Sequence, residues 1–427
     1  MGRDAYGDDT ASDRHTDALA QAKPDDLGFD PERLIRAMDV VVQGRAEGAY
    51  PGAVALVMRH GKVAITRAIG HARLGPEERI MTTDTIFDLA SITKVVAGVS
   101  AVLVLVDAGA WSLDDPVARF LPSFATGGKD VMTLRHILTH TSGLPPWRPC
   151  YVSARTATET MAAIGTAELE CSPGAQVQYS DLGMAVIRML VETVSGMDFG
   201  VLLQRHLFHP LGLRDTSYQP PREMWYRIAA TERGNRYERA MVGRVGLHFD
   251  RWRDYLLVGE VNDGNTYYAL QGVSSHAGLF ATAADLARFG QMYLQEGEWQ
   301  GRQIISASTV REATRLQTAT LNDCYGLGWR LPCTGRPSTP APFRSAVTRA
   351  IFPSAHGAPL PEPLAGQRFS AHTYGHTGFT GTSIVVDPVN DIVLILLTNR
   401  IHPDATRSGI DRVRCHWHNA VAAAIIT

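Results

Sequence analysis

The chain is organised around residues 85–106, which read TIFDLASITKVVAGVSAVLVLV. The apolar run 95–106 is too short to span a bilayer, and the helix-ending pattern Asp107-Ala108-Gly109 follows it. We therefore expect a buried helix with Ser91 at its amino end. Because side chains three positions apart share a helix face, Lys94 is expected beside the Ser91 hydroxyl.

A serine and a lysine at this spacing could form a nucleophilic pair. The free serine hydroxyl is a poor nucleophile near neutral pH, and a neighbouring amine can take its proton. Exposed N–H groups and the positive dipole end of the helix would add to this activation. The same pattern also arises by chance, with the serine as a helix N-cap and the lysine in solvent. The rest of the chain has to decide between these interpretations.

The composition indicates a globular protein that neither binds nucleic acid nor spans a membrane. The 427 residues, 45% of them apolar, can bury a large core, and the net charge of −2 leaves no basic surplus. The polar amino terminus lacks the apolar region of a signal peptide, so we expect a cytoplasmic protein, or a periplasmic or secreted one if a leader was removed. Five scattered cysteines without metal spacing favour free thiols in a reducing compartment.

Strand patterns lie near both ends of the chain. Strands are expected at 52–58, 63–69, 382–386 and 392–397, and terminal helices from residue 31 to Gly44 or Gly48 and at 407–425. The predicted fold class is α/β, with one antiparallel sheet formed by both chain ends and flanked by the terminal helices, plus a mostly helical lobe. The domain assignment is a flexible tail at 1–26, a sheet lobe at 27–90 and 325–427, and a helical lobe at 91–324. The two lobes would form one composite catalytic unit with its site in the cleft.

Three further segments have expected structures of their own. Residues 325–329 are predicted to form a strand. Residues 220–265 are irregular, which inside a compact protein is typical of a functional loop or an insertion. Residues 332–363 are rich in proline, alanine and arginine and are expected to form a long excursion loop.

Three histidines could belong to a functional site, either as metal ligands or as residues that point into a cleft. His136 and His140 could share a helix face, but no glutamate follows His136 as in H-E-x-x-H, so no metal site is predicted. His276 could point into a cleft, although a structural histidine bonded to the backbone is the preferred interpretation.

Two further motifs could complete an acyl-transfer site. Tyr179, in Tyr179-Ser180-Asp181, could relay protons, because nearby cationic groups favour the charged form of a tyrosine. His376-Thr377-Gly378 is expected to open a strand, and the glycines around it permit close backbone approach. Taken singly, Tyr179 could be a packed aromatic and His376 a loop histidine.

Together these motifs resemble the serine β-lactamase-like superfamily, in the branch that holds class C β-lactamases, DD-peptidases, penicillin-binding proteins and family VIII carboxylesterases. The matches are Ser91-x-x-Lys94, Tyr179-Ser180-Asp181 and His376-Thr377-Gly378. Supporting matches lie at 134–145, 210–213 and 276–280. The resemblance extends from about residue 30 to the carboxyl end.

The resemblance implies a role for each matched position. The catalytic set would be Ser91, Lys94, Tyr179 and His376. Ser91 would attack a carbonyl and become acylated, while Lys94 and Tyr179 share the acid–base work. The backbone N–H groups of Ser91 and Phe379 would form the oxyanion hole. The substrate contacts would be Asp181, Thr377 and Gly378, and no metal or organic cofactor is implied.

Two positions depart from the superfamily pattern. Asp181 stands where asparagine is common, and a carboxylate there would hold Lys94 in its charged form. His376 replaces the lysine of the K-T-G motif, and a histidine is mostly neutral at pH 7. A neutral side chain grips a substrate carboxylate less well than lysine does. This departure argues against an efficient β-lactamase and is compatible with esterases, aminopeptidases and some DD-peptidases.

Three hypotheses for function follow. The first is a serine hydrolase that cleaves small carboxylic esters or amides through an acyl-enzyme on Ser91. The second is a penicillin-binding DD-peptidase or a weak β-lactamase. The third is a binding module without chemistry, against which the intact serine, lysine and tyrosine argue. The expected partner is a small-molecule ester, amide or β-lactam, with no nucleic acid and no membrane span, and the oligomeric state is left open.

Overall fold

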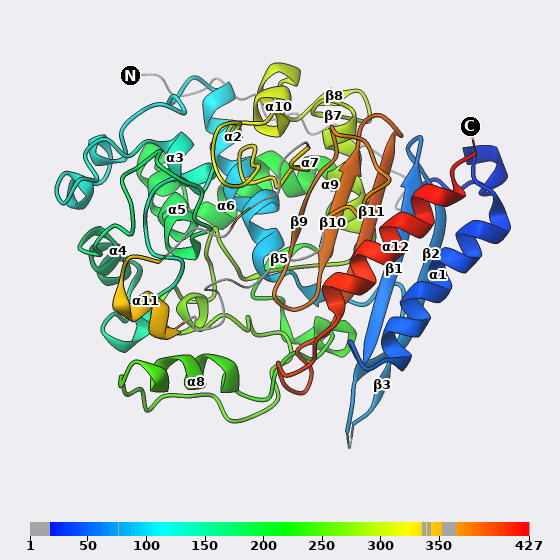
Figure 1. Ribbon diagram of the computed structural model, residues 1–427, viewed down its shortest axis with the longest axis horizontal. Helices are drawn as coiled ribbons and strands as arrows, with labels where there is room; N and C mark the ends of the chain where they lie inside the picture. Colours follow the sequence, from blue (N-terminus) through cyan, green and yellow to red (C-terminus); the bar gives the residue numbers. More distant parts are fainter. Residues whose placement is uncertain (1–17, 76, 335–338, 340–342, 352–363, 427) are drawn as a thin grey trace.

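The computed structural model describes residues 18–426, except residue 76 and residues 335–338, 340–342 and 352–363. Six strands form one antiparallel sheet in the order β3-β2-β1-β11-β10-β9 (Figure 1). Their bounds are Gly52–Arg59 (β1), Lys62–Arg73 (β2), Arg79–Ile80 (β3), Tyr374–Thr377 (β9), Ser383–Asp387 (β10) and Ile392–Thr398 (β11). The amino-terminal strand β1 pairs with the carboxyl-terminal strand β11, so both ends of the chain build the sheet, as predicted.

The two faces of the sheet are buried against different parts of the chain. Ala55 and Val57 of β1 lie in a core shared with the terminal helices, while their neighbours Val54 and Leu56 lie in a larger core shared with the helical lobe. The period-two alternation of a strand sends adjacent side chains to opposite faces. Because both faces are covered, β1 is buried along its whole length and is apolar up to its last residue, Arg59, instead of alternating with polar residues.

Helices α1 (Pro31–Ala46) and α12 (Ile410–Ala424) pack together on one face of the sheet (Figure 1). The first begins where Asp30 accepts a hydrogen bond from the Arg33 N–H and Pro31 occupies the first helical position. Both features are typical of a helix start, because the cap satisfies an orphan N–H and proline lacks one. The predicted terminal helices are confirmed.

The helical lobe covers the other face. Its helices are α2 (Ser100–Asp107), α3 (Leu134–Leu138), α4 (Ala157–Gly165), α5 (Asp181–Ser195), α6 (Phe199–Leu203), α7 (His209–Leu211), α8 (Arg236–Arg244), α9 (Ala283–Leu294), α10 (Ala307–Thr314) and α11 (Ala346–Ile351). Short strands are β4 (Phe87–Asp88), β5 (Ser217–Tyr218), β6 (Leu279–Ala281), β7 (Glu298–Trp299) and β8 (Arg302–Gln303). Helix α9 packs directly on the sheet, where Gly290 leaves room for Val393 of β11. The predicted α/β class is confirmed.

The segment around Ser91 is not the regular helix that the sequence predicts. Ala90–Ile92 form a single 3-10 turn, Lys94–Val99 form a π-helical segment, and α2 begins only at Ser100. The φ angle of Ala90 is 47°, in the left-handed region. Such a conformation costs about 1–3 kcal/mol outside glycine and persists where the surroundings impose it. Ser91 therefore lies at a sharp strand-to-helix turn.

The same segment is the main apolar helix of the core. Residues Ala90–Asp107 are long and apolar enough to cross a bilayer by composition, but 72% of them are buried inside the protein. Val95, Val96 and Val99 are fully buried in the larger core. In this fold the segment is a core helix and not a membrane span.

Several local predictions differ from the structure. The predicted strand at 325–329 is wrong, because Tyr325 and Arg330 make only single bridges, the second of them to Gly375 of β9. Residues 220–265 contain α8, which the sequence did not predict. The excursion loop 332–363 falls partly outside the described residues, and α11 lies within its described part. Of the predicted tail, residues 1–17 are also outside, whereas Ala20 and Ala22 bond to the backbone of Val63.

The expectation of five free thiols is also wrong. Cys324 and Cys333 form a disulfide, while Cys150 and Cys171 are free. The connecting loop folds back to bring the two α-carbons within 5.5 Å, a closure that sequence spacing alone does not reveal.

Candidate active site

Ser91 lies within reach of two proton-transfer groups. The Lys94 Nζ donates to the Ser91 Oγ at 2.8 Å, and the Tyr179 hydroxyl is hydrogen-bonded to the same serine. Lys94 also lies over the Tyr179 ring, 5.0 Å from its centroid. The structure therefore brings together the three residues that the motifs propose as nucleophile and acid–base pair.

The side chain of Asp88 stabilises the turn on which Ser91 lies. Its carboxylate accepts hydrogen bonds from the N–H groups of Ala90 at 2.9 Å and Asn262 at 2.8 Å. Complete burial raises the pKa of Asp88 to about 6, against these two hydrogen bonds. A short side chain that captures a backbone N–H two residues on is a common way to fix a tight turn. Here it fixes the left-handed Ala90 and so the direction of Ser91.

Lys94 is fully buried, and its Nζ donates to the Ser91 Oγ at 2.8 Å and to the His276 carbonyl at 3.0 Å. The Nζ also lies 2.6 Å from the Asp181 Oδ1, as an ion pair. Two hydrogen bonds and one carboxylate therefore surround the buried amine. The motif spacing predicts Asp181 near Lys94, and in the structure the two form a direct ion pair.

Tyr179 is positioned by the loop after α3. The N–H of Ser180 donates to the His140 Nδ1 at 3.2 Å, and the Ser180 Oγ caps α5 and donates to the Pro145 carbonyl. The His140 ring also packs on Tyr179, with centroids 4.4 Å apart. Because Nδ1 accepts a hydrogen bond, the proton of a neutral His140 lies on Nε2. His140, weighed above only as a metal ligand, is thus a positioning residue for Tyr179.

Tyr179 is a proton donor in this environment. Complete burial and then the charge of Asp181 raise its pKa well above the usual value, and the bond to Ser91 offsets only part of this. The tyrosine is therefore protonated at neutral pH. The expectation that cationic neighbours would ease its ionisation is outweighed by burial, because removal from water disfavours the phenolate.

The edge strand β9 closes the site opposite the helical lobe. Gly378 follows its last residue, and an added Cβ there would clash with the Leu89 carbonyl and the Thr382 Oγ1. The hydroxyls of Thr380 and Thr382 donate to the carbonyls of Asp88 and Leu89, at 2.8 and 3.0 Å. The strand end is therefore fastened to the residues that lead into Ser91. This contact places Phe379 at the rim of the site.

His376 and Thr377 are the last residues of β9, so the prediction that they open a strand is wrong; His376 is buried. The His376 Nδ1 donates to the carbonyl of Thr377 at 2.8 Å, and its ring lies 6.1 Å from that of Tyr179. Burial and then the charge of Lys94 lower the pKa of His376 to about 3. The imidazole is neutral over the working range of most enzymes. It can orient a substrate by hydrogen bonding, but it supplies no fixed positive charge.

The neutrality of His376 has a measurable consequence for stability. The pKa of His376 is about 3 in the folded protein and about 6.5 in the unfolded chain. Above about pH 6.5 the histidine is neutral in both states and the folded protein keeps its full stability. As pH falls from about 6.5 toward 3, only the unfolded chain binds the proton, so the free energy of unfolding decreases. We expect the stability advantage of the wild type over His376→Asn to shrink by about 2 kcal/mol between pH 7 and pH 5. Denaturant unfolding of both proteins at the two pH values measures it. An unchanged difference would show that His376 is solvated.

A cavity of about 240 Å³ opens onto the nucleophile. Its lining residues are Asp88, Ala90, Ser91, Trp147, Tyr179, Asp181, Glu232, Tyr237, Glu238, Met241, Asn262, Asp263, His276, Ala277 and Phe379. Six of them come from the region 220–265, whose irregular sequence predicts a functional loop or an insertion and marks none of these residues individually.

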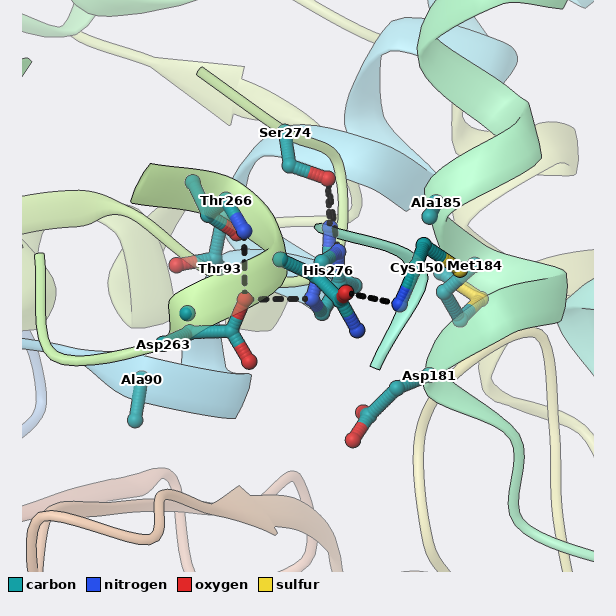
Figure 2. A network of polar contacts seen from close by, with 12 residues as sticks. Ala90, Thr93, Cys150, Asp181, Met184, Ala185, Asp263, Thr266, Ser274 and His276 are labelled. Carbon is teal, nitrogen blue, oxygen red and sulfur yellow. Dashed lines mark hydrogen bonds and ion pairs between the residues drawn. The ribbon is translucent and has the colours of Figure 1, made fainter. Parts of the chain in front are cut away.

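His276 has a double role in this wall. Its buried ring bonds to the Ser274 hydroxyl at 2.6 Å and to the Asp263 Oδ1 at 3.1 Å (Figure 2). Its carbonyl holds Lys94. The preferred interpretation as a histidine bonded to the backbone is wrong, because both ring bonds go to side chains and His276 lines the cavity.

A serine held between a lysine and a tyrosine, in a cleft between an antiparallel sheet and a helical lobe, defines a class of serine acyl-transfer enzymes. The profile of the Beta-lactamase family matches residues 37–415. The chain belongs to the β-lactamase family and is a serine hydrolase.

Individual relatives agree with this membership. A protein of Escherichia coli K12, provisionally named a D-alanyl-D-alanine carboxypeptidase, is 30% identical over 90% of this chain and 86% of its own. A penicillin-binding protein homologue from Caulobacter crescentus has a TM-score of 0.65 at 22% identity, covering 93% of this chain and 99% of that one. A family VIII carboxylesterase has a TM-score of 0.67 at 19% identity, with the same coverage of both chains. The two structures show the shared fold.

Proposed function

We propose that the protein hydrolyses small carboxylic esters or amides through an acyl-enzyme on Ser91. The observation that carries the proposal is the Ser91 Oγ, hydrogen-bonded to both Lys94 and Tyr179 and open to a cavity of about 240 Å³. A cavity of this size suits a small acyl group. Family membership supports the serine chemistry.

The geometry supports a division of the acid–base work. Lys94, in its free-amine form, takes the Ser91 proton as the oxygen attacks the carbonyl carbon, and Asp181 at 2.6 Å stabilises the ammonium that forms. The protonated Tyr179 gives its proton to the leaving oxygen or nitrogen and regains one from Lys94. Water then attacks the acyl-serine with the same groups in reverse. Ser91 and Phe379 N–H groups would hold the oxyanion in both steps.

The cavity chemistry favours esters and amides without a carboxylate. Among the described lining residues there is no lysine or arginine, and five are aspartate or glutamate. His376 stands neutral where a lysine would grip a substrate carboxylate. A β-lactam and a D-Ala-D-Ala terminus both carry such a carboxylate, so the electrostatics of this cavity oppose them.

A second candidate function is D-alanyl-D-alanine carboxypeptidase activity. The observation that favours it is the provisional name of the relative from Escherichia coli K12, at 30% identity over 90% of this chain. In that case the substrate carboxylate would lie at the β9 edge and away from the acidic cavity.

Three assays on one preparation separate these functions. Short-chain p-nitrophenyl esters report esterase turnover, a D-Ala-D-Ala peptide reports release of D-alanine, and a fluorescent penicillin reports covalent labelling of Ser91. We expect ester turnover to exceed the other two. Release of D-alanine at a higher kcat/KM than any ester would overturn the first proposal in favour of the second.

A further inference from the structure

The cavity beside Ser91 has an unusual charge. Five carboxyl side chains line it, namely Asp88, Asp181, Glu232, Glu238 and Asp263, and no lysine or arginine is among its described lining residues. Lys94, next to the cavity, is already paired with Asp181. Because the cavity also holds the nucleophile, these carboxyls face the substrate of an existing site.

Asp263 is the carboxylate best placed to meet a substrate charge. Its Oδ1 accepts hydrogen bonds from the Thr266 N–H at 2.7 Å and pairs with the His276 ring at 3.1 Å. Figure 2 shows the other oxygen turned away from both partners. Burial raises the pKa of Asp263, but His276 and Thr266 outweigh it and hold the pKa at about 2. Asp263 therefore stays ionised.

Glu238 lies close enough to Asp263 to be affected by this charge. It accepts hydrogen bonds from the Gly264 N–H at 2.7 Å and the Tyr151 hydroxyl at 2.9 Å. Burial and then the Asp263 charge raise the pKa of Glu238 to about 8. The Asp263 charge disfavours the ionisation of Glu238, and a cation bound beside the two carboxyls would relieve this repulsion.

Arg253 lies near the cavity carboxyls but makes its close contacts with other residues. The Arg253 guanidinium lies 3.7 Å from the centroid of the Tyr267 ring, donates to the Asn235 Oδ1 at 3.0 Å and lies 3.5 Å from Glu260. It is not among the lining residues. Arg253 lowers the pKa of Asp88 and of Glu238, but it acts on them without lining the cavity itself.

Aromatic side chains complete the wall. Trp147, Tyr179, Tyr237 and Phe379 all line the cavity, and the Tyr237 and Phe379 rings lie 5.0 Å apart at its rim. The faces of aromatic rings attract cations, and apolar walls strengthen that attraction by excluding water. Carboxylates accept hydrogen bonds from an ammonium group and ring faces attract its charge, so a small cavity lined by both suits an ammonium ligand.

We propose that this cavity selects ester or amide substrates that carry an ammonium group close to the scissile carbonyl. The inference rests on the proposed hydrolase function and adds the charge of its substrate. Asp263 is the specificity-determining residue, with Glu238 beside it, and the aromatic rim shields the pair from solvent. An anionic substrate of the same size would be rejected.

The test uses three p-nitrophenyl esters of similar length and different charge. They are the cationic 4-(trimethylammonio)butyrate, its neutral isostere 5,5-dimethylhexanoate, and the anionic glutarate. We expect kcat/KM to be at least about tenfold higher for the cationic ester than for the neutral one, and lowest for the anionic one. Asp263→Asn should lower the cationic-to-neutral ratio about tenfold, which corresponds to about 1.4 kcal/mol. Asp39→Asn, on the exposed surface of α1, is the matched control and should keep the wild-type ratio.

The outcomes separate this inference from the proposed function. Turnover of the neutral ester with no preference for the cationic one overturns the cation site and leaves the hydrolase standing. If no ester is turned over, calorimetry with butyltrimethylammonium still decides. Binding by the wild type that weakens in Asp263→Asn supports the cation site, and no binding overturns it. Thermal unfolding of each variant shows whether a change in ratio reflects the charge or a loss of fold.

Discussion

Ser91→Ala is expected to lower kcat/KM for the preferred p-nitrophenyl ester by at least about 10⁴-fold, because removing a nucleophile eliminates the covalent route. The alanine keeps the backbone N–H of the oxyanion hole, so any residual activity would come from binding and water attack. Substrate affinity should change little. Initial rates with the purified variant, together with intact mass after exposure to a fluorophosphonate, provide the measurement.

The control is Ser123→Ala, which removes an exposed serine hydroxyl elsewhere in the helical lobe. This variant should keep wild-type rates and one fluorophosphonate adduct per chain. Equal turnover by Ser91→Ala and the wild type would refute the assignment of the nucleophile. An adduct that persists in Ser91→Ala would point to a second reactive residue.

The parts of the site that are close in sequence could be predicted well. Ser91 and Lys94 are three residues apart, and that spacing keeps them adjacent although the local backbone is a 3-10 turn and a π-helical segment and not a regular helix. The sheet was predictable for a similar reason. Buried strands such as β11 are apolar runs of characteristic length, bounded by turn residues.

Tyr179 and His376 required a different kind of information. Each lies far from Ser91 in the sequence, and nothing in local propensity brings them to one cleft. Their assignment came from the order of the motifs along the chain. The structure shows the contacts responsible, such as the His140 bond to the Ser180 N–H and the Thr382 bond to the Leu89 carbonyl.

The acidic cavity wall could not have been predicted residue by residue. Asp263 lies in an irregular segment and Glu238 in α8, a helix that the sequence did not predict, so neither side chain could be placed in advance. The Asp263 side chain is held by Thr266 and His276, and the Glu238 side chain by Gly264 and Tyr151. The disulfide between Cys324 and Cys333 is a similar case, since two cysteines nine residues apart pair only if the loop between them folds back.

Lys94→Met is expected to lower kcat/KM by about 10²–10⁴-fold, because the variant lacks the general base. It should also lower the free energy of unfolding, since Asp181 loses its 2.6 Å partner. The loss should fall below the roughly 3–5 kcal/mol seen when fully buried pairs are broken, because the Asp181 side chain is 25% exposed to solvent. Steady-state kinetics and urea unfolding measure the two effects separately.

The double variant Lys94→Met/Asp181→Asn distinguishes a catalytic lysine from a structural one. Asparagine carries no charge to leave unpaired, so the second substitution should recover most of the lost unfolding free energy. Activity should not recover, because the base is still absent. Asp181→Asn alone should stay active, because it removes the ion-pair partner at 2.6 Å and leaves the lysine in place. Activity that returns with stability in the double variant would show that Lys94 only holds the fold together.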